Sequence, residues 1–456
     1  MKHFRSVSQI HNRVLCGAAM LLFGTSGILN AQAGQKQFVP FNQFVAGTKA
    51  AKISDYFAKE GAQVRDTQAF EEMRQHILSQ YEGVQVSHSF ELDGSHFDCV
   101  SVEEQPSVRL SDDKSIATPP PASVLKELFA DTGNAADQSA ARPQIAGRET
   151  DEFGNSRVCE DGTIPMRRIT LDDTTRFATL RDFFSKGPDG SGQAPHLATP
   201  GGAAHKYSYT YEYVNNYGDT TTINLWSPYV NTSEGEVFSL AQSWTVGTSP
   251  TTQTAEVGWQ NYPAFYGGEN SRLFIYWTAD GYNKTGCYDE NCTGFVQTGS
   301  NWYLGGGWSN YSTIGGAQYE FTARYYLSGG KWWLGLGSSP TNATWFGYYP
   351  ASQYGSGTMA THSNLIEFGS ESVGTSVWPP EGSGDWASAG FGYAAYQRAL
   401  YHWSDPKATA TWDSLTVAEP SPSCYSIAGP YNNGWNPPSN DWGIYFYFGG
   451  PGGSGC

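Results

Sequence analysis

The spacing of hydrophobic residues in the first half of the chain predicts a small region of mixed helix and strand. Four residues recur with the 3.6-residue period of an amphipathic helix: Phe70, Met73, Ile77 and Tyr81. Three more alternate as in a strand: Val84, Val86 and Phe90. A second helix is predicted to begin at Thr170, with three hydrophobic side chains on one face: Phe177, Leu180 and Phe184.

After residue 203 the pattern changes to short, closely spaced runs that are typical of strands. Turns rich in Gly, Asn, Ser and Asp separate these runs, and helical periods are scarce. The predicted strands are KYSYTYEYV, TTINLWSPYV, TAEVGWQNY, RLFIYWTA, WYLGGGW, AQYEFTARYYL, KWWLGLG, NLIEFGSE and IYFYFGG. The pattern predicts an all-β domain, a curved antiparallel β-sandwich of jelly-roll type, preceded by a small α+β domain.

Composition places the boundary between the two regions. All 15 Trp lie at or after Trp226, and the segment KGPDGSGQAPHLATPGG has too many Gly and Pro for regular structure. We therefore expect a small α+β domain at 34–185, an exposed linker at 186–202 that proteases can cut, and the β-sandwich at 203–456.

The first 33 residues are predicted to be a signal peptide. Basic residues precede an apolar run at 14–28, and the small-residue triplet at 31–33 follows it. A retained membrane anchor is the alternative, but the run is shorter than the roughly 20 residues that span a bilayer. No later segment is apolar enough to span a membrane, so we expect a secreted protein, extracellular or periplasmic.

Six cysteines remain after residue 33, and an even number in an exported chain predicts three disulfides. Spacing favours the pairs Cys99–Cys159, Cys287–Cys292 and Cys424–Cys456. A zinc site is the competing interpretation, and it is disfavoured because the single C-x4-C pair has no second ligand pair nearby.

The charge balance narrows the class of protein further. The chain has 27 Lys and Arg against 43 Asp and Glu, a formal net charge of −16, so we expect no nucleic-acid partner. Residues 203–456 contain only seven basic and 18 acidic side chains. Because acid unfolds proteins largely by protonating paired carboxylates and leaving cations to repel one another, this domain is expected to tolerate acid.

The familiar hydrolase and nucleotide motifs are missing from the sequence. There is no G-x-S-x-G, no H-E-x-x-H, no dinucleotide fingerprint and no P-loop, and the predicted sandwich contains only three histidines: His205, His362 and His402. Carboxylates are the remaining candidates for catalysis.

Two predicted strands each carry an acid next to a glycine on one face. In TAEVGWQNY, strand alternation puts Glu256 and Gly258 on the face opposite the apolar residues. In NLIEFGSESV, it puts Glu367, Gly369 and Glu371 on one face. A single Glu most often lies on a solvated face, so alternation alone does not make these residues catalytic.

Several unusual segments, in the same order, resemble the neprosin family of secreted glutamic endopeptidases that cut after proline. They are CEDGTIPMRR, AEVGWQNYPAFYG, RLFIYWTADGYNKTGCYDENCTGFVQ, IEFGSE and the terminal FYFGGPGGSGC. The resemblance extends from about Phe38 to the C-terminus. It implies that residues 34–185 are an activation domain, an intramolecular inhibitor that is removed on maturation, and that no metal or organic cofactor is required.

The same resemblance assigns candidate catalytic residues. The family's first catalytic glutamate, in an E-V/A-G-W segment, corresponds to Glu256, and its second, in a W-G-G-E segment, corresponds to Glu371. The sequence departs from the second segment, because Phe368 replaces Trp and Ser370 replaces Gly. Glu367 lies on the same face, and it is the alternative second acid.

Two carboxyl groups that converge would hold one proton between them and titrate as a unit. The ionised group can then activate a water molecule, while the protonated group donates to the scissile carbonyl oxygen. The sequence does not say which glutamate takes which role. Pro188, Pro195 and Pro200 lie in the predicted linker, so we expect acidification to trigger self-cleavage there and release the aromatic domain.

Two other classes of protein would share part of this pattern. A jelly-roll glycoside hydrolase would also show paired carboxylates and exposed aromatic residues. A carbohydrate-binding module would need the aromatic residues but neither glutamate. The expected substrates of the peptidase are peptides or proteins that contain proline, because stiff, proline-rich chains bind aromatic grooves at low entropic cost.

Overall fold

The computed structural model describes residues 38–121, 124, 150–187, 205–407, 410–435 and 440–456. The predicted signal peptide and all but the first two residues of the predicted linker therefore lie outside the described residues. Residues Val39–Cys456 form one compact unit. We call the described residues up to Ser185 the N-terminal domain, and those from His205 the sandwich.

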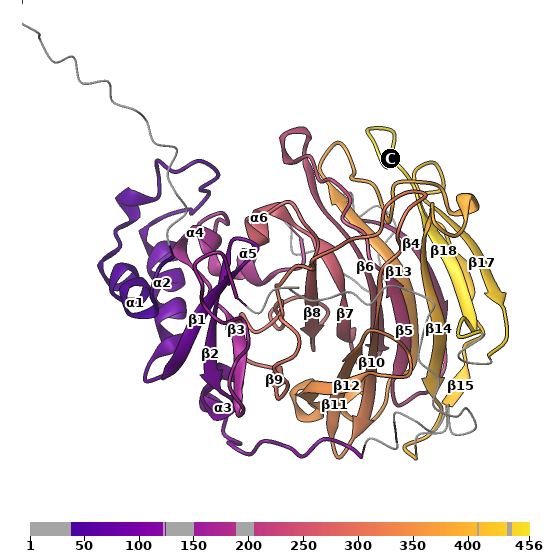
Figure 1. The fold of residues 1–456 in the computed structure, drawn as a ribbon, viewed down its shortest axis with the longest axis horizontal. Coiled ribbons are helices and arrows are strands. Elements are labelled where there is room, and N and C mark those ends of the chain that lie inside the picture. Colours follow the sequence, from indigo (N-terminus) through magenta and orange to yellow (C-terminus); the bar gives the residue numbers. More distant parts are fainter. Residues whose placement is uncertain (1–37, 122–123, 125–149, 188–204, 408–409, 436–439) are drawn as a thin grey trace, which may run out of the picture. The chain divides into compact units, whose positions relative to one another are not determined.

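Helices are few and mostly short (Figure 1). They are α1 (Phe41–Ala50), α2 (Thr67–Tyr81), α3 (Pro106–Arg109), α4 (Leu171–Thr174), α5 (Leu180–Phe184) and α6 (Pro263–Tyr266). The predicted amphipathic helix is confirmed as α2, and the four residues of its stripe are buried. Asp66 caps this helix, since its carboxylate accepts a hydrogen bond from the backbone N–H of Ala69 at 2.8 Å.

The N-terminal domain contains a three-stranded antiparallel sheet. Its strands are β1 (Val86–Leu92), β2 (Ser95–Ser101) and β3 (Thr163–Arg167). Asp93 and Gly94 form the two-residue turn between β1 and β2, with φ of 57° and 82°. Positive φ at both positions is what a type I′ hairpin turn requires, and Asp-Gly is a favoured pair there.

The second predicted helix is interrupted, which corrects the sequence-based expectation. It begins after Thr170 as predicted, but it ends at Thr174, and a separate helix, α5, starts after Thr179. Each helix has its own capping box, Thr170 with Asp173 and Thr179 with Asp182. The second box satisfies a new set of free backbone N–H groups, so the chain starts a new helix there.

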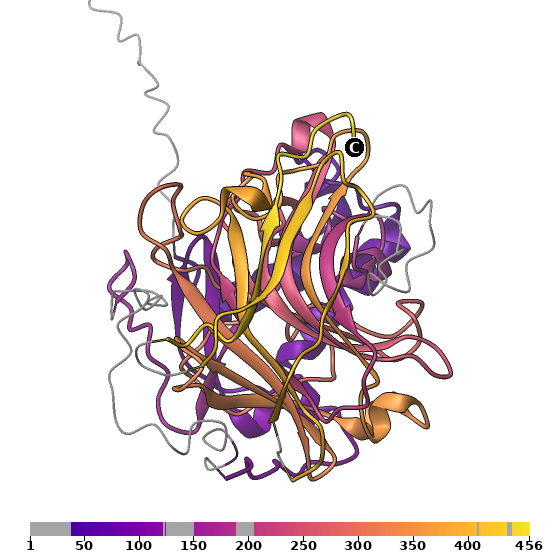
Figure 2. The same cartoon turned by 90° about the vertical axis from the view of Figure 1, so that its right-hand side faces the viewer.

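Two antiparallel sheets form the sandwich, one of six strands and one of nine (Figures 1 and 2). The six-stranded sheet has the order β16 (Thr416–Ala418), β4 (His205–Glu212), β13 (Leu365–Gly374), β6 (Glu236–Gly247), β7 (Gln253–Asn261) and β8 (Arg272–Thr278). The larger sheet has the order β17 (Ser426–Asn432), β18 (Ile444–Gly449), β14 (Ala395–Trp403), β5 (Asp219–Asn224), β10 (Glu320–Ser328), β11 (Lys331–Gly337), β12 (Thr344–Pro350) and β9 (Val296–Gln297), with β15 (Ala410–Trp412) paired to β14. The predicted fold class is confirmed.

Seven of the nine predicted runs contain a strand over most of their length. Within TTINLWSPYV the strand β5 ends at Asn224, and WYLGGGW forms turns instead of a strand. Gly305 has φ of +73°, a left-handed conformation that breaks the extended chain. Among the described residues, seven strands of the sandwich lie outside the predicted runs: β6, β9, β12, β14, β15, β16 and β17.

Alternating residues fill the space between the two sheets. From β7 the inward-facing residues are Ala255, Val257 and Trp259, and from β13 they are Ile366 and Phe368. They pack with apolar residues of β5, β10, β11, β14 and β18. The faces predicted for β7 and β13 are therefore confirmed, and the glutamates of both strands lie on the opposite face of the six-stranded sheet.

A second hydrophobic cluster joins that opposite face to the N-terminal domain. The sheet contributes Tyr207, Leu240, Trp244, Phe274 and Tyr276, among others, and the N-terminal domain contributes residues of α2, β3 and α5. The N-terminal domain thus covers the face of the sheet that carries the glutamates.

The three predicted disulfides are confirmed: Cys99–Cys159, Cys287–Cys292 and Cys424–Cys456. In the part of the chain that the structure describes, every helix is too short or too polar to cross a bilayer.

Candidate active site

The register of the six-stranded sheet places the candidate residues in three adjacent rows across its strands. The first row contains Tyr211, Glu367, Trp244, Glu256 and Tyr276. The second row contains Tyr209, Gly369, Gln242, Gly258 and Phe274. The third row contains Tyr207, Glu371, Leu240, Gln260 and Arg272. All three rows lie on one face, because residues two apart in a strand point the same way.

Lys186 connects Glu256 to Glu371, although the two glutamates are in different rows. Its Nζ lies 2.6 Å from Oε2 of Glu256 and 2.8 Å from Oε2 of Glu371. All three side chains have no exposed surface. The prediction that Lys186 lies in an exposed linker is wrong. Lys186 is buried because the two carboxylates beside it compensate for the solvation that its charge loses.

Glu367 is separated from Glu256 in the structure. It lies in the same row as Glu256, but the indole of Trp244 stands between them on β6. The second row, which lies between Glu256 and Glu371, has glycines on β7 and β13, Gly258 and Gly369, so no side chain of these two strands separates the glutamates. The geometry therefore pairs Glu256 with Glu371, and we call these two residues the glutamate pair.

Glu256 accepts hydrogen bonds at both carboxylate oxygens. Oε1 accepts from Tyr282 Oη at 2.6 Å and from Thr254 Oγ1 at 2.8 Å. Oε2 accepts from Gln242 Nε2 at 3.0 Å, in addition to its contact with Lys186. Neutral donors from three different positions thus fix the orientation of this carboxylate.

Glu371 depends more strongly on cationic neighbours. Its Oε1 contacts His205 Nδ1 at 2.5 Å, and its Oε2 contacts Lys186. Burial by itself would raise the pKa of Glu371, but the charge of Lys186, together with the hydrogen bond from His205, holds this pKa below its usual value. The same two carboxylates raise the pKa of Lys186 against the effect of its burial.

Tyr282 reaches Glu256 from a strained loop. Its φ of 63° lies in the left-handed region, which is rare for a bulky residue and costs about 1–2 kcal/mol. Asp280 stabilises the loop by accepting hydrogen bonds from the backbone N–H groups of Asn283, Lys284 and Thr285. Strain that is maintained by surrounding contacts is common at active sites, and here it places a hydroxyl group on Glu256.

The nine-stranded sheet, together with the 3₁₀-helical turn Ala351–Tyr354 after β12, supports the candidate site from the other side of the core. Tyr325 Oη donates to the backbone carbonyl of Glu256 at 3.0 Å, and Tyr354 Oη donates to that of Thr254 at 2.9 Å. Gln397 Nε2 donates to the backbone carbonyls of Gln242 at 3.2 Å and Gly369 at 3.1 Å. These bonds fix β6, β7 and β13 where the glutamate pair is attached.

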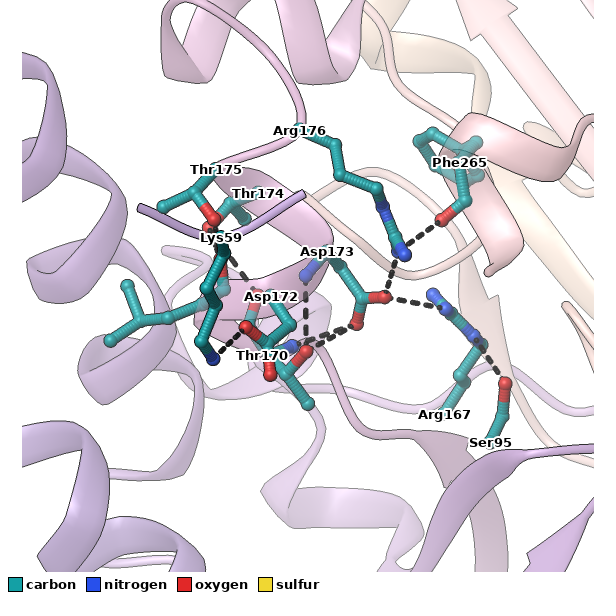
Figure 3. A network of polar contacts seen from close by, with 11 residues as sticks. Lys59, Ser95, Arg167, Thr170, Asp172, Asp173, Thr174, Thr175, Arg176 and Phe265 are labelled. Atoms are coloured by element: carbon teal, nitrogen blue, oxygen red, sulfur yellow. Dashed lines mark hydrogen bonds and ion pairs between the residues drawn. The ribbon is translucent and has the colours of Figure 1, made fainter. Parts of the chain in front are cut away.

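The N-terminal domain contacts the sandwich through Arg176, which Asp173 holds in an ion pair (Figure 3). The Asp173 carboxylate lies between Arg176, with which it forms an ion pair, and Arg167 at 3.5 Å. Arg176 Nη2 also donates to the backbone carbonyl of Phe265 at 3.4 Å. Phe265 belongs to α6, which directly follows β7 and therefore couples this docking contact to the strand of Glu256.

One group among the described residues has ligand atoms close enough to hold a metal ion. Glu212, His402 and Asp413 bring one ligand atom each to within 4.8 Å of one another. His402 Nδ1 and Asp413 Oδ1 already form a bond of 2.7 Å. This group shares no residue with the glutamate pair.

Sequence reasoning found both glutamates but not the residues around them. It missed β6, which carries Gln242 and Trp244, although Phe238, Leu240, Trp244 and Val246 alternate along that strand. It noted His205 only as one of three histidines. The contact of Lys186 with Glu256 depends on how the N-terminal domain docks, and that of Tyr282 depends on the conformation of its loop. No local sequence pattern predicts either contact.

The described residues thus form an antiparallel β-sandwich in which one lysine joins two buried glutamates on one face. Residues 235–451 match the family model described as Neprosin. The domain at residues 235–451 therefore belongs to the neprosin family, and it includes β6, both glutamates and the loop of Tyr282.

Solved structures of two peptidases are similar to this chain at low identity. Scytalido-glutamic peptidase with a transition state analog inhibitor is 9% identical, covers 53% of this chain and 97% of its own, and has a TM-score of 0.29. The same peptidase with a peptide-based transition state analog is 11% identical, with 55% and 98% covered and a TM-score of 0.29. SCP-B, a member of the Eqolisin family of peptidases, in a complex with the tripeptide Ala-Ile-His, is 8% identical, with 54% and 98% covered and a TM-score of 0.27.

Proposed function

We propose that this chain is a secreted, acid-active glutamic endopeptidase that cleaves after proline and is made as an inactive precursor. The observation that carries the proposal is the contact of one ammonium group, Lys186 Nζ, with Glu256 and Glu371 together. A small polar group that fits between two buried carboxyls marks the position where a nucleophilic water would be held once the lysine has left.

In the proposed reaction, Glu256 is the base and Glu371 is the acid. Glu256 keeps three neutral hydrogen-bond donors after Lys186 leaves, and these hold its carboxylate in a fixed orientation toward the water. It takes a proton from water as the water oxygen bonds to the carbonyl carbon, and the carbonyl oxygen takes the proton of Glu371. On collapse the C–N bond breaks, the leaving nitrogen takes the proton from Glu256, and Glu371 regains a proton from a hydroxyl of the intermediate.

Lys186 and the N-terminal domain account for the inactivity of the precursor. The ammonium occupies the water position, and its charge lowers the pKa of Glu371, so that Glu371 does not act as the acid. The N-terminal domain covers the substrate-binding face with the cluster that includes Phe183, which stacks on Phe265 with centroids 4.9 Å apart. This domain therefore serves as the intramolecular inhibitor in the proposal.

Acid weakens this inhibition. The pKa of Glu371 is lowered in the folded precursor, so the stability that its contact with Lys186 contributes is present above the ordinary pKa of a glutamate. That contribution is lost as the pH falls through the lowered value. Protonation of Glu371 removes one of the two charges that hold Lys186, which supports release of the segment and cleavage within residues 187–203 at low pH.

The aromatic residues around the glutamate pair support the proposed preference for proline. The indole of Trp244 lies 5.3 Å from Lys186 Nζ, and the rings of Tyr276 and Tyr282 stack with centroids 5.8 Å apart. Flat aromatic walls suit the rigid, apolar proline ring. Trp259 and Trp277, in contrast, belong to the core between the sheets.

The test is to acidify the purified full-length chain and follow both its processing and its hydrolysis of peptides. We expect a new N-terminus within residues 187–203 and cleavage of test peptides after proline. Glu256→Gln and Glu371→Gln should each lower peptide hydrolysis by at least 1,000-fold while the fold remains intact.

Glu367→Gln is the matched control, because Glu367 is a buried glutamate on the same strand and face as Glu371. It should change the rate by less than tenfold. The glycoside hydrolase alternative would be favoured if both pair variants lost polysaccharide cleavage and no variant cleaved peptides. Sugar binding that survives both substitutions, without any hydrolysis, would favour the carbohydrate-binding module.

A further inference from the structure

Gln242 occupies the centre of the site, between the two glutamates. Glu256, Gln242 and Glu371 lie on one diagonal across β7, β6 and β13, one in each successive row. The neighbours of Gln242 in its own row are Gly258 and Gly369, so no side chain stands beside its amide on either adjacent strand. Any substrate that reaches both glutamates must therefore pass over Gln242.

The hydrogen-bonding capacity of this amide is only partly used. Gln242 is completely buried, and its Nε2 donates to Glu256 Oε2 at 3.0 Å. Its Oε1 is buried and accepts no hydrogen bond from the residues that the structure describes. A glutamine amide offers two N–H donors and one carbonyl acceptor, and buried polar groups are normally satisfied. Within the described part of the chain, the Gln242 amide is held only through its Nε2, next to the glutamate pair. It is therefore suited to form a further hydrogen bond with a substrate that enters the site.

The backbone under Gln242 is fixed more firmly than its side chain. Gln397, from the nine-stranded sheet, donates to the backbone carbonyl of Gln242 and to that of Gly369. Gly258 is required by the close approach of the strands, because a Cβ atom there would lie 2.6 Å from Cβ of Gln242 and 2.0 Å from the carbonyl oxygen of Ala241. The backbone at Gln242 is thus held at a fixed position, and from there the side-chain amide reaches Glu256, as preorganised catalysis requires.

We propose that Gln242 is a further catalytic residue of the peptidase reaction, and that it donates its second amide N–H to the carbonyl oxygen of the scissile bond. This inference rests on the proposed function. One N–H holds Glu256 Oε2, which takes the proton from water, and the other stabilises the carbonyl oxygen as the electron pair of the C=O double bond moves onto it. Glu371 then protonates the same oxygen. The single amide therefore aligns the base with the group that is attacked.

The experiment compares Gln242→Met, Gln242→Glu and the control Gln260→Met in enzyme that wild-type protein has processed in trans. Gln260 is a buried glutamine of β7, on the same face of the six-stranded sheet as Gln242. Its Nε2 donates to Tyr288 Oη at 3.1 Å. Hydrolysis of a proline-containing fluorogenic peptide is measured between pH 3 and pH 7. We expect Gln242→Met to lower kcat by about 10²–10³-fold, the usual loss for one oxyanion donor, with KM within threefold of wild type. Gln260→Met should leave both constants within threefold.

Gln242→Glu supplies the readout that a structural role would not move. A protonated carboxyl can donate a hydrogen bond and an ionised one cannot. The activity of this variant relative to wild type should therefore rise at least tenfold as the pH falls. Because the substitution keeps the shape of the side chain, it decides the question even if Gln242→Met does not fold.

Two results would overturn the inference while the proposed function stands. In one, wild type cleaves the peptide, Glu256→Gln does not, and Gln242→Met retains kcat within threefold. In the other, Gln242→Glu follows the wild-type pH profile throughout. If wild type and Gln260→Met fail to cleave any peptide, the proposed function is wrong and the role of Gln242 is withdrawn with it.

Discussion

At the scale of single residues, the two glutamates differ in what surrounds them. Glu256 is held by Thr254, Tyr282 and Gln242, all of which belong to the sandwich. Glu371 is held by His205 and by Lys186, and Lys186 precedes the segment in which cleavage is expected. Maturation would therefore leave the environment of Glu256 largely unchanged and would remove a positive charge from that of Glu371.

Tyr282→Phe tests whether the strained loop serves the site. The variant removes the O–H that donates to Glu256 Oε1, and a hydrogen bond to a charged group is worth about 1.5–3 kcal/mol. We expect kcat of the processed enzyme to fall by about 10–100-fold, measured on a proline-containing peptide. Tyr276→Phe is the control, because the Tyr276 hydroxyl donates to Phe184 of the N-terminal domain, and the processed enzyme should retain at least a third of its rate.

Lys186→Met tests the inhibitory ammonium. The side chain keeps its length but loses the charge that both carboxylates require, and a buried charge without its partner costs about 3–5 kcal/mol. We expect the full-length variant to process itself at a pH at which wild type remains intact, as judged by the appearance of the sandwich fragment on a gel. Lys206→Met, whose ammonium lies over the ring of Trp378, should process like wild type. Identical pH dependence of processing in all three proteins would contradict the proposed role of Lys186.

At the scale of elements, β6, β7 and β13 form the site, and the sequence predicted only two of these strands. Alternation identified the faces of β7 and β13 because their inward residues are strongly apolar. β6 has the same alternation on its outward face, from Phe238 to Val246, but its inward face contains Ser239, Ala241 and Ser243. A strand whose core-facing side chains are small does not appear as an apolar run, so the strand between the glutamates was missed.

The position of Lys186 could not have been predicted from local sequence. The chain KGPDGSG has the composition of a linker, and composition does not encode which groups a segment meets after folding. The contact between Lys186 and Glu256 joins residues 70 positions apart and depends on the docking of a separate domain. The two capping boxes after Thr170 were visible in the sequence, since Thr179 and Asp182 repeat the spacing of Thr170 and Asp173.

Gly258→Ala tests the packing of β6 against β7. The added methyl group must displace either the carbonyl of Ala241 or the side chain of Gln242, and such overpacking costs about 1–3 kcal/mol. We expect a lower melting temperature and at least a 100-fold loss of peptide hydrolysis. Gly455→Ala is the control, because its added Cβ has no atom within 4 Å, and both measurements should stay at wild-type values.

At the scale of the whole molecule, most shifted carboxyls of the sandwich have a raised pKa, whereas those of the N-terminal domain have a lowered one. Burial raises the pKa of six carboxyls of the sandwich: Asp219 to about 6, Asp289 and Asp413 to about 7, Glu290 and Glu381 to about 8, and Glu236 by a smaller amount. In the N-terminal domain, hydrogen bonds lower the pKa of Asp66, and they lower that of Asp151 against the effect of its burial. Asp66 caps α2, and Asp151 accepts from the backbone N–H of Glu91.

The sign of each contribution follows from linkage. A carboxyl whose pKa is raised on folding binds its proton more tightly in the native state, so its stabilisation is full below the ordinary pKa near 4 and is lost as the pH rises to the folded value. For the lowered group Asp151, stabilisation is present above the ordinary pKa and is lost in acid.

We therefore expect the melting temperature of the processed sandwich to fall by several degrees between about pH 4 and pH 8, as followed by circular dichroism. In the full-length chain, the N-terminal domain should become the more protease-sensitive part below about pH 4. A sandwich that melts at higher temperature as the pH rises through this range would contradict the assignment of neutral buried carboxyls.

The two side chains that contact Glu371, Lys186 and His205, stand on opposite sides of residues 188–204 in the chain. Any cut between them leaves the histidine with the sandwich and the lysine with the other fragment. Before the cut, a short tether keeps the ammonium at an effective concentration in the millimolar range; afterwards its concentration is only that of the free fragment. After one cut, dilution would make the release of Lys186 from the glutamate pair effectively irreversible. The proposed enzyme would then need no further signal to remain active.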